Sequence, residues 1–221
     1  MKINKFSNDL PKEIVAKIKD SVAIDTEATG LKIPERDKLS LIQLCDASGN
    51  VYVIQPDRKT YKAPNLVSIL EDEKILKIGH FLRFDKNALE FFLKCKIKNI
   101  FDTKIASKVV RTYTDQHGLK NLVYEFCNKN LDKRAGSSDW NKNINELTDK
   151  QLEYAANDVI YLHKIKNELE KMLKRENRMD LYQNCITFLD TRIALDQSGF
   201  KFDIFEHCLL YTSPSPRDPN R

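Results

Sequence analysis

The alternation of apolar and polar residues in the first half of the chain predicts strands. The run Val22–Ile24 is apolar and largely β-branched, as a buried strand requires, and it leads into Asp25-Thr26-Glu27 and a polar turn. Residues 39–45 and 51–54 have the same apolar character and are separated by the turn 46–50. Because the connectors are short, we expect these three strands to form an antiparallel meander.

Helical spacing dominates the rest of the chain. A short helix over residues 10–18 precedes the central strand, and a brief helix at 64–70 precedes a fourth strand at 75–81. From Asp85 onward, apolar residues recur at helical intervals. They are Ala88, Leu89, Phe92 and Leu93, then Ile105, Ala106, Val109 and Val110, then Leu119, Leu122, Val123 and Phe126. Three strands, then strand, helix and strand, then helices predict an α/β fold in which helices flank a mixed sheet.

The region from residue 128 to residue 195 contains one irregular segment and two predicted helices. Residues 128–145 are polar and include Trp140, which either lies on a loop that approaches substrate or anchors the packing. Thr148 and Gln151 fit a capping box that opens a long helix running through Leu162 and Ile165. A last helix over about 181–195 is expected to pack against it.

Composition favours one soluble domain. The chain has 221 residues, 41% of them hydrophobic and 31% charged, and no apolar run approaches the length of a membrane span. Its first ten residues are mixed and polar, so we expect no secretory leader and a cytoplasmic protein. The five cysteines are odd in number and contain no C-x-x-C pair, which predicts reduced packing residues. A net charge of +5 is compatible with nucleic acid binding without establishing it.

The last residues differ in character from the rest. The stretch from about residue 208 to residue 221 resembles translated sequencing-adapter sequence, and we predict that it is non-native. The expected domain therefore comprises residues 1–207.

Acidic residues at the ends of predicted elements are the candidate chemistry. Asp25 and Glu27 lie two residues apart on a strand and therefore on one face, where they would repel unless a cation lay between them. Tyr154 and Asp158 are four residues apart on a helix, and Asp85 follows the fourth strand at the same sheet edge as Asp25. The four acids can therefore converge, and oxygen ligands suit Mg²⁺ or Mn²⁺.

Each acid also has an ordinary structural interpretation. Asp25 and Glu27 can be a solvated strand end, Asp85 a helix N-cap, and Asp158 a solvated acid paired with Lys164.

In five motifs the chain resembles the DEDDy-type 3′→5′ exonucleases of the ribonuclease H-like fold, and specifically ribonuclease D in its short bacterial form. The motifs are Asp25-Thr26-Glu27-Ala28-Thr29-Gly30-Leu31, His80-Phe81-Leu82-Arg83-Phe84-Asp85, Thr103-Lys104-Ile105-Ala106-Ser107 with Arg111-Thr112-Tyr113-Thr114-Asp115, Ser137-Ser138-Asp139-Trp140, and Tyr154-Ala155-Ala156-Asn157-Asp158. The resemblance covers nearly the whole chain to about residue 207. Phe81 replaces the Asn that is usual in the related proofreading domains of family A DNA polymerases, which favours ribonuclease D.

The resemblance implies a two-metal hydrolysis that releases nucleoside 5′-monophosphates from single-stranded RNA 3′ ends. Asp25, Glu27 and Asp158 would hold the metal that activates water, and Asp25 and Asp85 would hold the second. Tyr154 would orient the water. Thr26 and Leu31 are the implied substrate contacts, although Leu31 can equally be a core leucine. The implied metals are two Mg²⁺ or Mn²⁺ ions.

Two other functions are compatible with the same sequence. A 3′→5′ DNA exonuclease would use the same residues, because only contacts to the 2′-hydroxyl distinguish the two substrates. A catalytically silent nucleic-acid-binding module could also share the fold. Neither the physiological RNA nor an oligomeric state follows from the sequence.

Secondary candidates surround the acids. Asp102 is either a spare ligand or the N-cap of the next helix, and His80 and His117 either contact phosphate or are structural. A basic stripe with Tyr113 for stacking is possible, or these charges are a solvated face. The stripe consists of Lys104, Lys108, Arg111 and Lys120.

Overall fold

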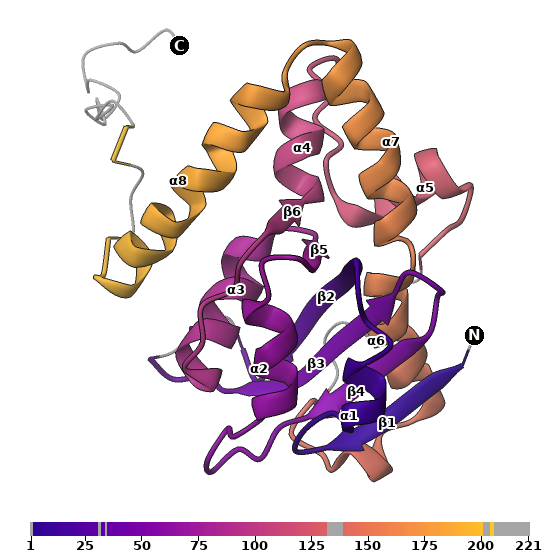
Figure 1. The fold of residues 1–221 in the computed structure, drawn as a ribbon, viewed down its shortest axis with the longest axis vertical. Coiled ribbons are helices and arrows are strands. Elements are labelled where there is room, and N and C mark those ends of the chain that lie inside the picture. The colour runs from indigo at the N-terminus through magenta and orange to yellow at the C-terminus, as the bar shows by residue number, and fades with distance from the viewer. Residues whose placement is uncertain (1, 31, 34, 132–138, 201–203, 206–221) are drawn as a thin grey trace, which may run out of the picture.

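A six-stranded mixed sheet forms the centre of the computed structural model, which describes residues 2–30, 32–33, 35–131, 139–200 and 204–205. The strand order is β1-β4-β3-β2-β5-β6 (Figure 1). The strands are β1 (Ile3–Ser7), β2 (Ser21–Ala28), β3 (Leu39–Asp46), β4 (Val51–Gln55), β5 (Leu76–Gly79) and β6 (Ile100–Asp102). The predicted meander is confirmed, because β3 pairs antiparallel with both β2 and β4. The added β5 and β6 are parallel to β2, so the sheet is mixed, as predicted.

Helices cover both faces of this sheet. The helices are α1 (Lys12–Val15), α2 (Pro64–Glu71), α3 (Leu82–Leu93), α4 (Thr103–Val110), α5 (Leu119–Cys127), α6 (Asp149–Ile160), α7 (Leu162–Arg175) and α8 (Met179–Gln197), with a short 3₁₀ helix, η2 (Ile144–Glu146). On one face, Ile24, Ile42 and Ile54 pack with α2 and α3. On the other face, Ala23, Leu41 and Cys45 pack with α4 to α7.

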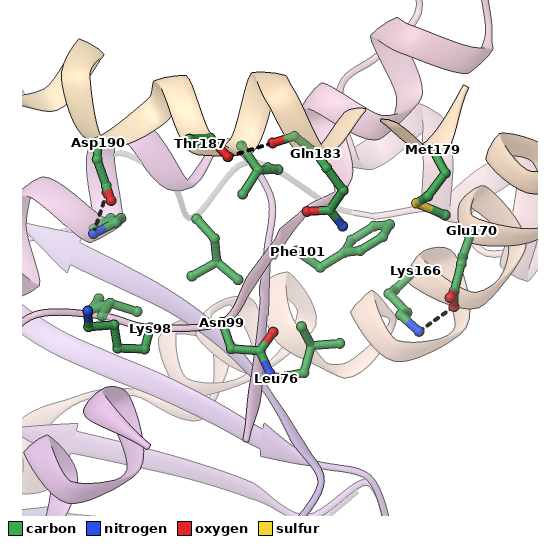
Figure 2. A pocket seen from close by; sticks show the side chains of 14 residues that line it. Leu76, Lys98, Asn99, Phe101, Lys166, Glu170, Met179, Gln183, Thr187 and Asp190 are labelled. Atoms are coloured by element: carbon green, nitrogen blue, oxygen red, sulfur yellow. Dashed lines mark hydrogen bonds and ion pairs between the residues drawn. The ribbon is translucent and has the colours of Figure 1, made fainter. Parts of the chain in front are cut away.

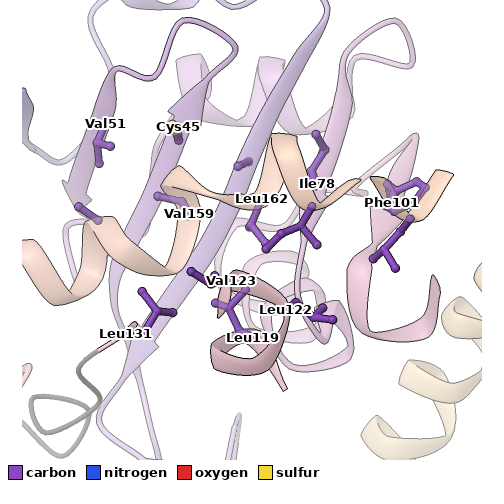
Figure 3. Close-up of a cluster of buried hydrophobic side chains, with 14 of the residues drawn as sticks. Cys45, Val51, Ile78, Phe101, Leu119, Leu122, Val123, Leu131, Val159 and Leu162 are labelled. Atoms are coloured by element: carbon purple, nitrogen blue, oxygen red, sulfur yellow. The ribbon is translucent and has the colours of Figure 1, made fainter. Parts of the chain in front are cut away.

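Alternation along the strands explains the two cores. In β2, and in β3 from Leu41 onward, even-numbered residues face α2 and α3, whereas odd-numbered residues face α6 and α7. Leu39 lies beyond the register shift and packs with the first set. Figure 3 shows the second core, in which Val159 and Leu162 approach the sheet side chains Cys45, Val51 and Ile78. Asp25 and Glu27 are odd-numbered, so β2 directs them to the side of the sheet that α6 covers.

Two expectations about elements are wrong. The sequence predicts no element in the first ten residues before the short helix, yet β1 pairs parallel with β4 at the edge of the sheet. An edge strand needs only one apolar side and tolerates polar residues on the other, so its pattern is weak. The helix opened by Thr148 ends at Ile160, and a separate helix starts at Leu162. The apolar pattern crosses this break because both helices pack on the same core.

Other expectations agree with the structure. Thr148 and Gln151 form the predicted capping box, and α8 covers the predicted last helix. Trp140 is only 4% exposed and its ring centroid lies 6.1 Å from that of Tyr154, so it is a packing anchor.

The predicted non-native tail, which includes Cys208, lies outside the described residues. The four cysteines among the described residues are free. Among the described helices, none is both long and apolar enough to cross a bilayer.

Candidate active site

Three carboxylates meet where β2 ends beneath α6. Asp25 and Glu27 come from one side of β2, and a register shift follows between Glu27 and Ala28. Asp158 comes from α6, which lies across β2, β3 and β4. One oxygen from each of the three side chains lies within 4.8 Å of the others. Asp158 is buried, whereas Asp25 and Glu27 are half-buried.

The chemistry of this cluster fits a hard divalent cation. Three carboxylates at this spacing repel one another unless positive charge compensates them. Their oxygens are the donors that Mg²⁺ and Mn²⁺ prefer. Three of the predicted site residues are therefore close enough to share one ion: Asp25, Glu27 and Asp158.

Tyr154 lies one helical turn before Asp158, and the negative charges of the three carboxylates act on its phenol. Burial raises the pKa of its phenol well above the ordinary value, and the charges of Asp158, Glu27 and Asp25 raise it further. The phenol is therefore protonated at neutral pH. It can donate a hydrogen bond into the space around the acids.

Asp85 is not a member of the three-carboxylate group. It lies on α3, which packs on the other face of the sheet, and its Oδ1 accepts a hydrogen bond from Thr26 Oγ1 at 2.5 Å. Burial raises the pKa of Asp85 to about 7. Thr26 is itself buried, so its hydroxyl serves Asp85 in this structure. The fourth acid is thus joined to the cluster through the strand residue between Asp25 and Glu27.

Two neighbouring residues place the start of α3, and with it Asp85. Gly79 ends β5, and a Cβ on it would lie 2.2 Å from Leu82 Cδ2, so any other residue would force the Leu82 side chain to move. The Asp102 carboxylate accepts backbone N–H groups from Phe81 and Leu82 at the start of α3. It also accepts those of Lys104 and Ile105 at the start of α4, so its expected N-cap role is confirmed and extends to a second helix.

The remaining polar candidates have structural partners. His80 Nδ1 lies 3.0 Å from Thr103 Oγ1, and His117 Nδ1 lies 2.9 Å from Ser107 Oγ. Arg111 does not belong to an exposed basic stripe, because it is 2% exposed and pairs with Ser107 and Glu125. Its sequence position, between Val110 and Thr112, gave no sign of this burial.

Lys104 is half-buried and lies over an exposed aromatic ring. Its ammonium lies 4.2 Å from the centroid of the Phe81 ring, which is 44% exposed. Leu31 and residues 132–138 lie outside the described residues, so their predicted roles have no structural counterpart here.

A separate pocket of about 410 Å³ lies between β6, α7 and α8. Figure 2 shows Lys166, Phe101, Gln183 and Thr187 around it. Its acidic lining consists of the ion-paired Glu170 and Asp190 of the helices and includes none of the candidate acids, so it is distinct from the carboxylate cluster.

Sequence reasoning missed one polar residue beside the cluster. Gln43 pairs directly with Asp25 across the β2–β3 ladder and is fully buried. The available signal was an amide in the middle of the otherwise apolar run Leu41–Cys45.

Fold and site together define a class of protein. Residues 4–174 match the family of 3′-5′ exonucleases, and the chain belongs to that family.

Particular relatives refine this assignment. Ribonuclease D of Gluconacetobacter diazotrophicus is 31% identical over 203 residues, which are 90% of this chain and 48% of that protein. DNA polymerase I of Aquifex aeolicus is 33% identical over 159 residues, which are 68% of this chain and 24% of that protein. The predicted resemblance to ribonuclease D is confirmed. The chain spans about half the length of that ribonuclease D and about a quarter of the polymerase.

Solved structures of Brucella melitensis NrnC are similar over nearly their whole length. The structure bound to pGG is 45% identical, with a TM-score of 0.87, and the match covers 94% of this chain and 99% of that one. The structure with bound Mg²⁺ is 44% identical, with a TM-score of 0.85 and coverage of 94% and 100%.

Proposed function

We propose that this protein is a metal-dependent 3′→5′ exoribonuclease that releases nucleoside 5′-monophosphates from the 3′ end of RNA. The observation that carries the proposal is the Asp25, Glu27 and Asp158 cluster within 4.8 Å, beside a protonated Tyr154. We propose further that residues 1–207 form the exonuclease domain and that residues 208–221 contribute nothing to it.

The carboxylates would hold two divalent cations. Asp25, Glu27 and Asp158 would hold one, and Asp25 and Asp85 would hold the other. When bound, Mg²⁺ or Mn²⁺ would lower the pKa of the attacking water and stabilise the leaving 3′ oxygen. Asp85 has to be ionised for this role, and a neighbouring cation would favour its charged form against the effect of burial.

Tyr154 would position the nucleophile. Its phenol is protonated and hydrogen-bonds to Asp158, and it would hold a water molecule when its single O–H donates to the water oxygen instead. A water held in line with the scissile phosphorus would attack it directly, with no covalent intermediate. Holding the water in place lowers the entropic part of the activation barrier.

The substrate is proposed to be single-stranded RNA with a free 3′ end. Support comes from the ribonuclease D relative and from the match to NrnC bound to pGG over nearly its whole chain. We therefore include pGG as a short substrate. The polymerase relative favours DNA as the second candidate substrate, and the test separates the two.

The test is a product ladder from 5′-labelled single-stranded RNA and from DNA of the same sequence, each with Mg²⁺, with Mn²⁺ and with chelator. We expect RNA to shorten one nucleotide at a time from its 3′ end, and pGG to yield mononucleotides, both only when metal is present. A chain cut after residue 207 should be equally active. Faster shortening of the DNA would favour the second candidate.

A matched variant controls the site assignment. Asp158→Asn keeps the shape of the side chain but removes one negative charge from the cluster, so it should abolish turnover while leaving the fold intact. RNA binding without any metal-stimulated release, in a folded wild-type protein, would replace this proposal with that of a silent binding module.

A further inference from the structure

Gln43 is a buried amide without a hydrogen-bond partner beside the carboxylate cluster. It lies in the middle of β3, and its side chain is fully buried. Neither its Nε2 nor its Oε1 has a partner among the residues that the structure describes. A polar group in this situation requires an explanation.

The sheet register places Gln43 next to Asp25. The two residues are directly opposite in the antiparallel β2–β3 ladder. Opposite residues project from the same face of a sheet, with Cβ atoms about 4.5–5.5 Å apart. Their ladder neighbours Ala23 and Cys45 face the core beneath α6, which fixes that face as the one carrying the cluster.

Folding alone does not account for an amide at this position. Its β3 neighbours on the same face, Leu41 and Cys45, are apolar and buried. A buried donor or acceptor without a partner destabilises the folded state, so an apolar side chain of the same length would suit the fold better. The amide must therefore be explained by something other than the packing of the sheet.

We propose that Gln43 is a positioning residue for Asp25. Its amide N–H donates to the Asp25 carboxylate when that carboxylate binds a divalent cation, and so fixes the orientation of the bound oxygens. Carboxylates that bind metals are themselves held by hydrogen bonds from neighbouring groups. This inference rests on the proposed function, because it assigns Asp25 to a cation.

The decisive variant is Gln43→Met, which keeps the length of the side chain and removes its hydrogen-bonding groups. Loss of such a supporting hydrogen bond lowers metal affinity by about 10–100-fold. We therefore expect the Mn²⁺ concentration for half-saturation to rise by that factor. The readout is free Mn²⁺, measured by electron paramagnetic resonance during titration of the protein without substrate.

Urea unfolding of the same variant supplies a readout that separates positioning from packing. Because the amide makes no hydrogen bond within the described fold, Gln43→Met should unfold at a urea concentration no lower than wild type. The matched control is Leu44→Met, since Leu44 lies on the same strand but packs in the core beneath α2 and α3, away from the cluster. Leu44→Met should bind Mn²⁺ like wild type.

Each outcome is informative. Equal Mn²⁺ affinity of wild type and Gln43→Met would overturn the inference, and so would a large loss of stability in Gln43→Met, because the amide would then serve the fold. Either result leaves the proposed function standing if the wild type binds Mn²⁺ and shortens RNA. A wild type that does neither would refute the proposed function itself.

Discussion

Asp102 is where we expect a single conservative substitution to uncouple two helices. Its side chain is fully buried, and its Oδ1 accepts the N–H groups of Phe81, Lys104 and Ile105 at 3.2, 2.8 and 3.0 Å. Its Oδ2 accepts the N–H of Leu82 at 2.7 Å. In Asp102→Asn only one oxygen remains, and it can keep the N–H groups of Phe81, Lys104 and Ile105. The new NH₂ group then faces the N–H of Leu82, donor against donor.

The expected loss follows from these contacts. A hydrogen bond to a charged group contributes about 1.5–3 kcal/mol, and the Leu82 N–H would be left without a partner at the start of α3. Burial raises the pKa of Asp102, so neutralising the side chain recovers part of its desolvation free energy. We therefore expect Asp102→Asn to lower the free energy of unfolding by about 2 kcal/mol. Asp102→Ala should lose roughly 1–2 kcal/mol more, because the α4 cap is lost as well.

Urea unfolding followed by far-ultraviolet circular dichroism measures this loss. The midpoint should fall while the slope with urea stays constant, since the surface exposed on unfolding is unchanged. Asp115→Asn removes one charge at an exposed position and should change the stability by less than about 0.5 kcal/mol. If Asp102→Asn were as stable as this control, the two-helix role of Asp102 would be wrong.

Three further outcomes follow from other contacts. Gly79→Ala should cost about 1–3 kcal/mol in urea unfolding, because its Cβ would collide with Leu82, whereas a normal midpoint would show that α3 can shift freely. The Lys77 ammonium is buried on two backbone carbonyls, and burial lowers its pKa to about 8. In the unfolded chain Lys77 keeps its proton up to about pH 10.5, whereas in the folded protein it loses the proton near pH 8. The free energy of unfolding should therefore rise by up to roughly 3 kcal/mol between these two pH values. Lys77→Met should lack this rise. Asp158→Asn, inactive in the RNA ladder, should unfold at a higher urea concentration than metal-free wild type, because it relieves repulsion with Asp25 and Glu27; an unchanged midpoint would contradict that.

The central strand and its acids were predictable because their signals are local. Val22–Ile24 needs only its own sequence to read as a buried strand, and the two-residue period fixes which side Asp25 and Glu27 share. Thr148 and Gln151 indicate the start of α6 in the same way. The order of the motifs along the chain then predicts that Asp158 and Asp25 belong to the same site.

Contacts between distant segments were not predictable. Arg111 reads as one more surface cation, yet Ser107 and Glu125 enclose it. Asp102 reads as the cap of one helix, and only the parallel pairing of β5 with β6 brings the start of α3 to it. Gln43 gains its meaning from the ladder with Asp25. In each case the deciding neighbour is set by strand register or helix docking, which no local pattern contains.

The order of the elements along the chain determines when the enzyme can exist during its own synthesis. All six strands have been made by Asp102, whereas α6 starts only at Asp149 and brings Asp158 with it. Until then, the face that carries Leu41 and Cys45 has no α6 to cover it. At a synthesis rate of about 5–20 residues per second, the chain would spend several seconds with this apolar face uncovered and the carboxylate cluster incomplete. A nascent chain therefore acquires its complete sheet before Asp158 can join Asp25 and Glu27, and the carboxylate cluster is among the last features of the fold to form.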